Sequence, residues 1–240
     1  MIDQARGWIQ SARRVAVLTG AGISAESGVP TFRDAQTGLW SRFRPEQLAT
    51  EEAFRANPSM VWDWYAMRRE MLAQVEPNAG HRALSDFQRL HPGRLTLITQ
   101  NVDGLHQRAG NEDALALHGN LFENKWLDTP RNCCDADAAN PGSPPYCGRC
   151  GNRLRPAVVW FGEALPAATL QAAEQAAVSC DLMLVVGTSG VVYPAAGLAR
   201  MAGRSAKVVI VNPEPTELDD AAHAVLRGTA ARLLPALLAD

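Results

Sequence analysis

The sequence predicts an α/β fold in which a doubly wound, mostly parallel sheet carries a small inserted subdomain. Short apolar runs suited to buried strands recur along the chain, separated by stretches with the spacing of amphipathic helices. Polar or glycine-rich residues directly follow several of these runs, as they do at the ligand-binding edge of such a sheet. Between residues 123 and 155 the apolar periodicity is replaced by Asn, Pro, Gly and Asp around four cysteines, which predicts the inserted module.

Length and charge narrow the functional classes. With 240 residues the chain can bury a full core, and we expect residues 1–240 to form a single catalytic domain that includes the 123–155 module. A net charge of −2 gives no general attraction to nucleic acid or to anionic membranes. The N-terminal residues lack the apolar core of a secretory signal, and no run approaches the roughly 18–20 apolar residues of a membrane span. These features predict a cytoplasmic protein without nucleic-acid or membrane partners.

The chain begins with a predicted helix at 2–12, whose apolar residues recur at helical spacing, and a buried strand, VAVL, at 15–18. Gly20 and Gly22 then end the strand in a sharp turn. Glycine suits a phosphate-binding turn of the Rossmann-like kind, because a Cβ would hold the backbone away from a pyrophosphate. Ser24 is expected to cap a short helix whose free N–H groups face that anion. Two glycines alone are equally typical of an ordinary tight turn.

Two helices are expected next, at 45–55 and 59–74, separated at Pro58 because the residue before a proline avoids helical conformation. One stripe of the second helix combines apolar residues with Arg68. An arginine in that position extends to water, pairs with an acid elsewhere in the chain, or binds an anionic ligand, and the spacing leaves all three open. The stripe consists of Val61, Trp64, Tyr65, Arg68, Met71 and Leu72.

Polar residues follow two strands in the middle of the chain. A helix at 78–90 places His81 in its first turn, where we expect a packed, hydrogen-bonded side chain. The strand at 95–99 leads directly into QNVDGLH, and the strand at 114–117 ends at His118. Because ligands bind beyond the carboxyl ends of parallel strands, these residues are candidates for a site. Amides and a single histidine in such positions also serve as caps and turn residues.

The last third completes the sheet. A helix there ends before Cys180, which we expect to be an inert, packed thiol. Two of the strands end in small or hydrogen-bonding residues, Gly187 to Ser189 and Asn212 to Glu214, which suit a ribose. Strands are expected at 158–163, 181–186, 207–211 and 222–227, with helices at 165–178 and at the C-terminus.

Four of the five cysteines lie within the module. Cys147 and Cys150 have the Cys-x-x-Cys spacing that lets two thiolates reach one tetrahedral zinc. Cys133 and Cys134 are adjacent, a spacing that strains joint ligation of one ion. We predict a structural zinc, with a lapsed site as the alternative. A catalytic zinc is disfavoured because no histidine or acid joins the cluster, and disulfides are not expected in a reducing compartment.

Several motifs together resemble the sirtuins, which are NAD-consuming protein deacylases. They are GAGIS, AESG, PTFRD and GLW within residues 20–40, QNVDGLH at 100–106, HGNLF at 118–122 and VVWFGE at 158–163. The resemblance extends over about residues 15–230 and departs from the family at the first cysteine pair. Sirtuins usually have a first Cys-x-x-Cys soon after the His-Gly strand, where this chain has Trp126 and Thr129.

The resemblance implies that NAD is a co-substrate. It places Phe32 and Arg33 against the nicotinamide end, and Gln100, Asn101 and Asp103 against the ribose and carboxamide. The expected NAD contacts are Gly20, Ala21, Gly22, Ile23, Glu26, Thr31, Phe32, Arg33, Trp40, Gln100, Asn101, Val102, Asp103, Gly187, Thr188, Ser189, Asn212, Pro213, Glu214 and Ala230. The expected substrate contacts are Ala49, Tyr65, Arg68, Val159, Trp160, Phe161 and Gly162, of which the 158–163 segment would pair with the substrate backbone as an added strand.

The resemblance also implies the chemistry, which is removal of acyl groups from protein lysines. His118 would act as the general base and Asn101 as a catalytic positioning residue. The branch of the family that removes succinyl and malonyl groups has a Tyr-x-x-Arg pair, here Tyr65 and Arg68, and Ala49 resembles that branch's means of widening the pocket. We therefore expect succinyl- and malonyl-lysine proteins or peptides to be better substrates than acetylated ones, with O-acyl-ADP-ribose as product.

Two other classes remain open from the sequence. The same site could serve an NAD hydrolase or ADP-ribosyltransferase, whose product would be ADP-ribose or ADP-ribosylated protein. An NAD-binding regulatory module without catalysis is disfavoured, because His118 and Asn101 are both present.

Overall fold

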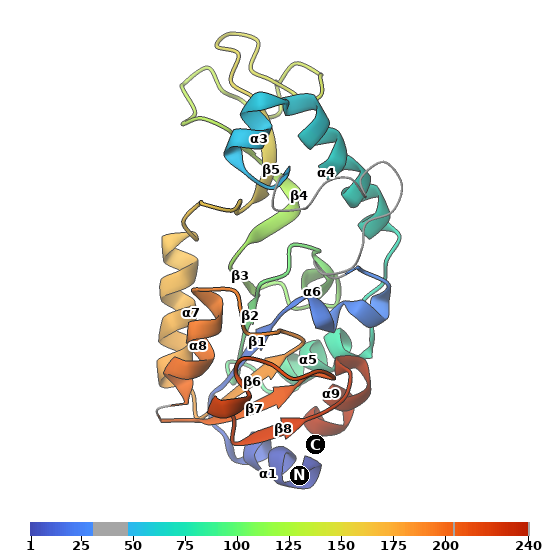
Figure 1. The fold of residues 1–240 in the computed structure, drawn as a ribbon, viewed down its shortest axis with the longest axis vertical. Coiled ribbons are helices and arrows are strands. Elements are labelled where there is room, and N and C mark those ends of the chain that lie inside the picture. The colour runs from blue at the N-terminus through green and yellow to red at the C-terminus, as the bar shows by residue number, and fades with distance from the viewer. Residues whose placement is uncertain (31–47, 204, 240) are drawn as a thin grey trace. The chain divides into compact units, whose positions relative to one another are not determined.

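A computed structural model describes residues 1–30, 48–203 and 205–239 of the chain. The described residues divide into two compact units. The first takes its residues from Met1–Phe32, Val75–His118 and Leu165–Asp240, and the second from Arg33–Gln74 and Gly119–Ala164. Figure 1 labels the helices and strands of both.

The first unit is built on a six-stranded parallel sheet with the order β3-β2-β1-β6-β7-β8. Val15 on β1 is paired with Leu95 on β2 at one side and with Leu182 on β6 at the other. The chain therefore runs outward from β1 to β3 and returns to build β6 to β8 on the opposite side, and ligands bind where a sheet reverses its order in this way. The strands are β1 (Val15–Thr19), β2 (Leu95–Thr99), β3 (Leu115–Ala116), β6 (Leu182–Val186), β7 (Lys207–Val211) and β8 (Ala224–Leu226).

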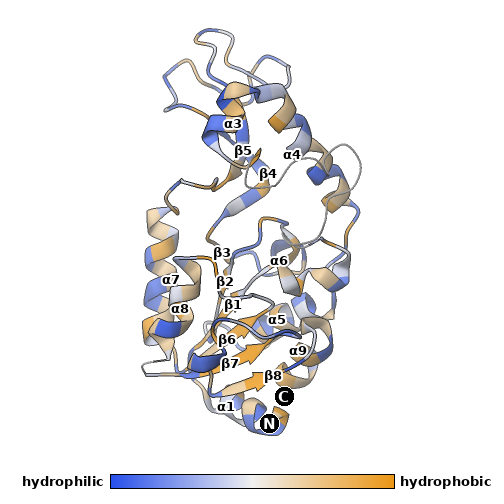
Figure 2. Ribbon diagram, in the orientation of Figure 1, coloured by the Kyte–Doolittle hydropathy of each residue, from blue (hydrophilic) through white to orange (hydrophobic). Residues whose placement is uncertain are grey.

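Helices cover both faces of this sheet (Figure 1). One face packs against α1 (Ile2–Ser11), α5 (Ala79–Leu90) and α9 (Ala230–Leu238), and the other against α7 (Ala167–Ser179) and α8 (Ala195–Ala202). Val15 and Val17 join the first core while Ala16 and Leu18 join the second, so every residue of β1 is buried. Figure 2 shows the resulting hydrophobic strands. These contacts confirm the predicted doubly wound α/β fold.

Among the residues that the structure describes, the second unit includes two named helices and an antiparallel strand pair. The helices are α3 (Glu51–Ala56) and α4 (Pro58–Ala73), and the strands are β4 (Gly119–Trp126) and β5 (Leu154–Val158), whose pairing is irregular between Asn120 and Asn124. The Thr50 hydroxyl accepts the Ala53 N–H and caps α3, and the Asn57 side chain accepts the Met60 N–H and caps α4. The cysteine-containing segment connects β4 to β5.

Three local predictions differ from the structure. Residues 45–47 of the helix predicted at 45–55 lie outside the described residues; Leu48 is helical, and after a break at Ala49 and Thr50 the chain forms α3 from Glu51. The strand predicted at 158–163 ends at Val158, because Gly162 has a φ of +86° and the Glu163 carboxylate accepts the Trp160 N–H at 2.8 Å, which turns the chain. Ser24 caps no helix through its side chain, since two 3₁₀ turns, η1 (Ala21–Ile23) and η2 (Ala25–Ser27), follow β1 instead.

The predicted stripe of α4 is only partly right, because Met71 is exposed. The sequence patterns also gave no sign of α6 (Leu105–Arg108), α8 or β4. α6 is a single turn and β4 has one fully buried residue, so neither has a strong apolar period, while α8 is short and has four alanines among its eight residues. In the described part of the chain, no helix has the length and apolar character needed to cross a membrane.

Candidate active site

A glycine turn joins the carboxyl ends of β1 and β6. The Gly20 N–H donates to the Val186 carbonyl at 3.0 Å, and the Gly22 N–H donates to the Gly187 carbonyl at 2.8 Å. A Cβ at Gly22 would lie 2.8 Å from the Gly187 Cα, and Gly187 itself has a φ of +62°, which L side chains rarely adopt. Glycine is therefore required here by the close approach of two strand ends, in addition to the access to phosphate that the sequence predicts.

A polar cluster connects this turn to the loop after β2. The Asn101 side-chain amide donates to the Gly20 carbonyl and to the Ser24 hydroxyl, both at 3.2 Å. The Ser24 hydroxyl in turn donates to Asp103 at 2.7 Å, and the other Asp103 oxygen accepts the Leu105 N–H at 2.9 Å. Burial raises the pKa of Asp103, although these two hydrogen bonds oppose the shift. The sequence predicted Asn101 and Asp103 as site residues but missed Ser24 as the group between them.

His81 supports the same cluster. Its Nδ1 accepts the Asn78 N–H at 3.3 Å, so Nε2 carries the hydrogen and donates to the Ser24 hydroxyl at 3.4 Å. Burial lowers the pKa of His81 to about 4, which keeps the ring neutral at pH 7. The prediction of a packed, hydrogen-bonded histidine is confirmed.

His106 is a second buried histidine of this unit, and the sequence assigned it no role. Its Nε2 lies 2.9 Å from the Thr19 hydroxyl, which donates to the Thr99 hydroxyl at 2.9 Å. Burial lowers the pKa of His106 to about 3. The sequence signal that could have identified His106 was its place at the end of QNVDGLH, shortly after the polar residues of the candidate site.

His118 lies at the end of β3 and has a defined tautomer. Its Nδ1 is 2.8 Å from the Gln100 carbonyl oxygen. A carbonyl only accepts hydrogen bonds, so Nδ1 carries the hydrogen and Nε2 keeps its lone pair. Burial lowers the pKa of His118, while the bond to Gln100 partly opposes this shift, and the ring is neutral at pH 7. The geometry is that of an oriented general base.

The ends of β6 and β7 lie beyond the glycine turn. The Gln100 side-chain amide donates to the Thr188 hydroxyl at 3.2 Å, which connects the loop after β2 to the end of β6. The Asn212 side-chain amide donates to the Glu214 carbonyl at 2.7 Å, and the Glu214 side chain is exposed. The Glu26 carboxylate accepts the Ala231 N–H at 2.9 Å and so holds the first turn of α9.

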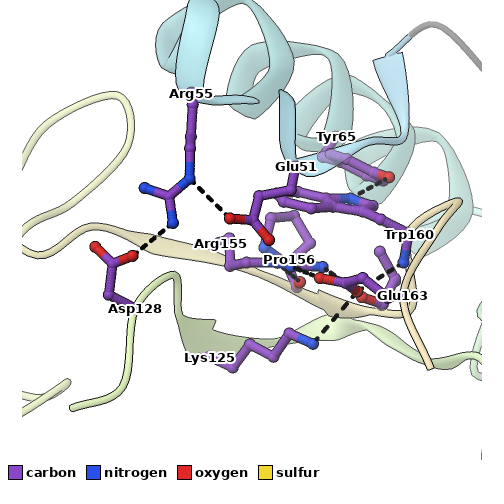
Figure 3. Close-up of polar contacts among 10 residues, drawn as sticks. Glu51, Arg55, Tyr65, Lys125, Asp128, Arg155, Pro156, Trp160 and Glu163 are labelled. Carbon is purple, nitrogen blue, oxygen red and sulfur yellow. Dashed lines mark hydrogen bonds and ion pairs between the residues drawn. The ribbon is translucent and has the colours of Figure 1, made fainter. Parts of the chain in front are cut away.

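In the second unit, Tyr65 and Arg68 lie one turn apart on α4. The Trp160 indole N–H donates to the Tyr65 hydroxyl at 3.0 Å (Figure 3). The Arg68 guanidinium lies 5.1 Å from the centre of the Trp64 ring, and it has no acidic partner among the residues that the structure describes. Burial lowers the pKa of Arg68. One of the three alternatives for Arg68 was an ion pair with an acid elsewhere in the chain. The described residues provide no such ion pair.

The turn after β5 contacts the residues before α3. The Phe161 N–H donates to the Ala49 carbonyl at 2.9 Å, while the Trp160 N–H is held by Glu163. Both of these backbone donors already have acceptors within the unit. A peptide that adds to this segment as a strand would have to use other backbone groups, such as those of Val159 or Gly162.

The four module cysteines form one cluster. Their sulfur atoms all lie within 4.8 Å of one another, although Cys133 and Cys134 are adjacent in the chain. The Cys134 N–H donates to the Arg131 carbonyl in a turn, and the Cys134 sulfur reaches to 3.5 Å from that of Cys150. Four thiolates around one point are a donor set typical of structural zinc. The expected strain of the adjacent pair does not keep either sulfur out of the cluster.

Comparison with known proteins decides the family. Residues 20–194 match the family model described as the Sir2 family. The chain belongs to the Sir2, or sirtuin, family. An NAD-dependent protein deacylase of Ralstonia nicotianae is 58% identical over 239 residues, covering 98% of this chain and 95% of that protein.

Solved structures of Sir2 proteins share this fold. The crystal structure of a Sir2 homolog–NAD complex superimposes with a TM-score of 0.88 at 42% identity, covering 98% of this chain and 92% of the other. A Sir2–p53 peptide–NAD⁺ structure has a TM-score of 0.83 at 30% identity, covering 98% and 95% of the two chains. These matches confirm the predicted sirtuin resemblance.

Most of the expected NAD contacts of this sirtuin lie at the carboxyl edge of the sheet in the first unit. Direct hydrogen bonds or backbone contacts join Gly20, Gly22, Gln100, Asn101, Asp103, Gly187 and Thr188 through the cluster around Ser24 and the glycine turn. Four of the expected contacts, Thr31, Phe32, Arg33 and Trp40, lie outside the described residues.

Proposed function

We propose that this sirtuin is an NAD-dependent protein-lysine deacylase that prefers succinyl- and malonyl-lysine to acetyl-lysine. Family membership and the deacylase relative support the general activity. The acyl preference rests on one observation, the half-buried Arg68 that stands next to Tyr65 without an acidic partner in the described chain.

The polar cluster of the first unit suits the chemistry of this reaction. NAD, when bound, supplies the ribose carbon that the acyl amide oxygen attacks as nicotinamide leaves, and its ADP-ribose carries the acyl group away. His118 would take the proton of a ribose hydroxyl at its free Nε2, because Gln100 occupies Nδ1. Asn101 and Asp103, which are held by Gly20, Ser24 and Leu105, would orient the sugar.

Arg68 and Tyr65 would recognise the carboxylate of an acidic acyl group. A guanidinium that forms a forked pair with a carboxylate contributes about 1.5–3 kcal/mol, or roughly 10–100-fold in preference. An acetyl group offers no such partner and would leave Arg68 unpaired. Ala49, with its short side chain, leaves room for the longer acyl chain.

We further propose that the four-cysteine cluster holds a structural zinc in the 123–155 module. All five cysteines are free thiols, which fits a reducing compartment such as the cytoplasm. Zinc would tie the segment between β4 and β5 to a single point and would take no part in the reaction.

Product analysis tests the proposed function. The purified protein would be incubated with NAD and one peptide sequence whose lysine carries a succinyl, malonyl or acetyl group. Mass spectrometry should detect nicotinamide, free lysine peptide and O-acyl-ADP-ribose, with the highest kcat/KM for the acidic acyl groups. Free ADP-ribose or ADP-ribosylated protein in place of O-acyl-ADP-ribose would instead support the hydrolase or transferase alternative.

A further inference from the structure

The hydrogen bond between Trp160 and Tyr65 determines the direction of the Tyr65 hydroxyl. An indole N–H can only donate, so the phenol oxygen is the acceptor in this 3.0 Å contact. The hydroxyl hydrogen of Tyr65 must therefore point to another group. No acceptor for it is found among the residues that the structure describes. Burial raises the pKa of Tyr65 to about 12, so this hydrogen is present at neutral pH.

The indole of Trp160 is itself held on several sides (Figure 3). The Arg155 guanidinium lies 3.1 Å from the centre of its ring, and the Phe54 ring lies 5.2 Å away on centroids. The Trp160 backbone N–H donates to Glu163 at 2.8 Å. With 2% of its surface exposed, Trp160 has no room to turn its N–H away from Tyr65.

Arg155 holds the Trp160 ring in place because the Arg155 guanidinium is itself held by an acid and a carbonyl. It is 2% exposed, forms an ion pair with Glu163, and donates to the Val158 carbonyl at 2.6 Å. Arg155 therefore has an acid and a carbonyl within its unit, whereas Arg68 on α4 has no acid among the described residues. Of these two arginines, only Arg68 is free to pair with the carboxylate of a ligand.

We infer that Trp160 is a positioning residue for acyl selection. Its indole N–H holds the Tyr65 oxygen as an acceptor, which directs the Tyr65 hydroxyl hydrogen to the carboxylate of a succinyl- or malonyl-lysine substrate beside Arg68. The inference rests on the proposed acidic-acyl preference. A carboxylate oxygen accepts such a hydrogen bond, whereas the methyl group of an acetyl-lysine cannot, so the contact discriminates between the two substrates.

A double-mutant cycle tests this inference. Trp160→Phe, Tyr65→Phe and the double variant would be assayed on succinyl and acetyl forms of one peptide. Phenylalanine keeps an aromatic ring between Arg155 and Phe54 and removes the N–H donor together with part of the ring volume. In Trp160→Phe the ratio of succinyl to acetyl kcat/KM should fall about two- to tenfold, mainly through the KM of the succinyl peptide. The double variant should show the ratio of Tyr65→Phe alone, since Trp160 acts through the Tyr65 hydroxyl.

The outcomes separate this inference from the proposed function. If the unmodified protein does not prefer the succinyl peptide, the proposed acyl preference is wrong. If it does, but Trp160→Phe lowers both activities equally or lowers the ratio independently of Tyr65, the inference alone is overturned. Trp62→Phe, on the same helix as Tyr65, is the matched control and should leave the ratio unchanged, because the Trp62 ring lies by Arg69.

A second measurement does not depend on the folding of Trp160→Phe. The protein has six tryptophans, and ¹⁵N labelling gives one indole N–H signal for each. Tyr65→Phe removes the acceptor and should move one of these signals upfield, and succinyl peptide should shift the same signal in the unmodified protein. If Tyr65→Phe moves no indole signal, the hydrogen bond does not exist in solution and the inference is wrong.

Discussion

The two units hold their candidate site residues in different ways. In the first unit, His81, His106 and His118 lose charge through burial and act as neutral hydrogen-bonding groups with defined donors and acceptors. In the second unit, the guanidinium groups of Arg68 and Arg155 lie over the rings of Trp64 and Trp160. The first arrangement suits the transfer of a proton, and the second suits the recognition of an anion.

The comparison also shows which polar groups are structural. Ser24 and Arg155 have their hydrogen-bonding capacity taken by neighbours within their own unit. His118 Nε2 and the Arg68 guanidinium are left without such partners in the described chain. Groups with open hydrogen-bonding capacity are the ones from which we expect direct contact with a substrate.

The largest effect is expected for substitution of His118, the proposed general base in the first unit. His118→Ala should lower kcat by roughly 10²–10⁴-fold and leave NAD affinity largely unchanged, because a general base is lost without loss of the binding groups. Single-turnover kinetics and NAD titration measure the two quantities. His91→Ala, which lies before the opposite end of β2, is the control and should turn over normally. Near-normal turnover of His118→Ala would remove this histidine from the mechanism.

Metal removal is expected to affect the second unit selectively. Cys150→Ser should lower bound zinc and the melting temperature, since the cluster loses one of its four sulfurs. Cys180→Ser is the matched control, because Cys180 lies outside the cluster with its thiol 3.2 Å from the Ala177 carbonyl. Metal analysis and thermal melts provide the readout. A zinc-to-protein ratio near zero in active protein would show that the module folds without an ion.

Substitution of Arg68 tests the proposed recognition of an acidic acyl group by the second unit. Arg68→Met should lower kcat/KM for the succinyl peptide by about 10–100-fold and affect the acetyl peptide far less. Arg69→Met is the control on the same helix. The Arg69 guanidinium donates to the Leu121 carbonyl at 2.6 Å, so its loss should affect stability and both substrates alike. Equal losses on both peptides in Arg68→Met would identify Arg68 as a structural residue.

The neutral histidines of the first unit predict how stability depends on pH. The folded pKa values of His81 and His106, about 4 and about 3, lie below the ordinary histidine value near 6.5. The unfolded chain therefore binds protons first, and stability present above pH ~6.5 is lost as the pH falls towards 4. Each histidine should contribute about 1.4 kcal/mol per pH unit in this range. Urea unfolding at pH 7, 6 and 5 measures the slope.

His106→Gln is the variant that sharpens this measurement. It removes one of the three buried rings whose folded pKa is lowered, so the pH slope should be shallower than in the unmodified protein. An unchanged slope would mean that His106 does not titrate between the folded and unfolded states as its burial predicts.

Much of the first unit could be predicted from short stretches of sequence. VAVL, LTLIT and LMLVV specify central strands because their residues are apolar on both faces, and β1 and β6 are indeed buried along their whole length. His118, Asn101 and Asp103 follow strand ends directly, and parallel strands bring such positions to one edge. The motifs around them also identified the family. Local pattern was sufficient wherever burial and strand direction decided the position of a residue.

Tertiary structure decided the partners of the side chains. The tautomer of His118 depends on the Gln100 carbonyl, the role of Ser24 on Asp103, and the direction of the Tyr65 hydroxyl on Trp160. The turn after Val158 and the approach of Cys133 and Cys134 to Cys147 and Cys150 likewise went against local expectation. A local pattern records how much of a residue is buried and where the backbone runs. A hydrogen-bond partner or a sulfur cluster depends on residues far apart in the chain, which only folding brings within reach.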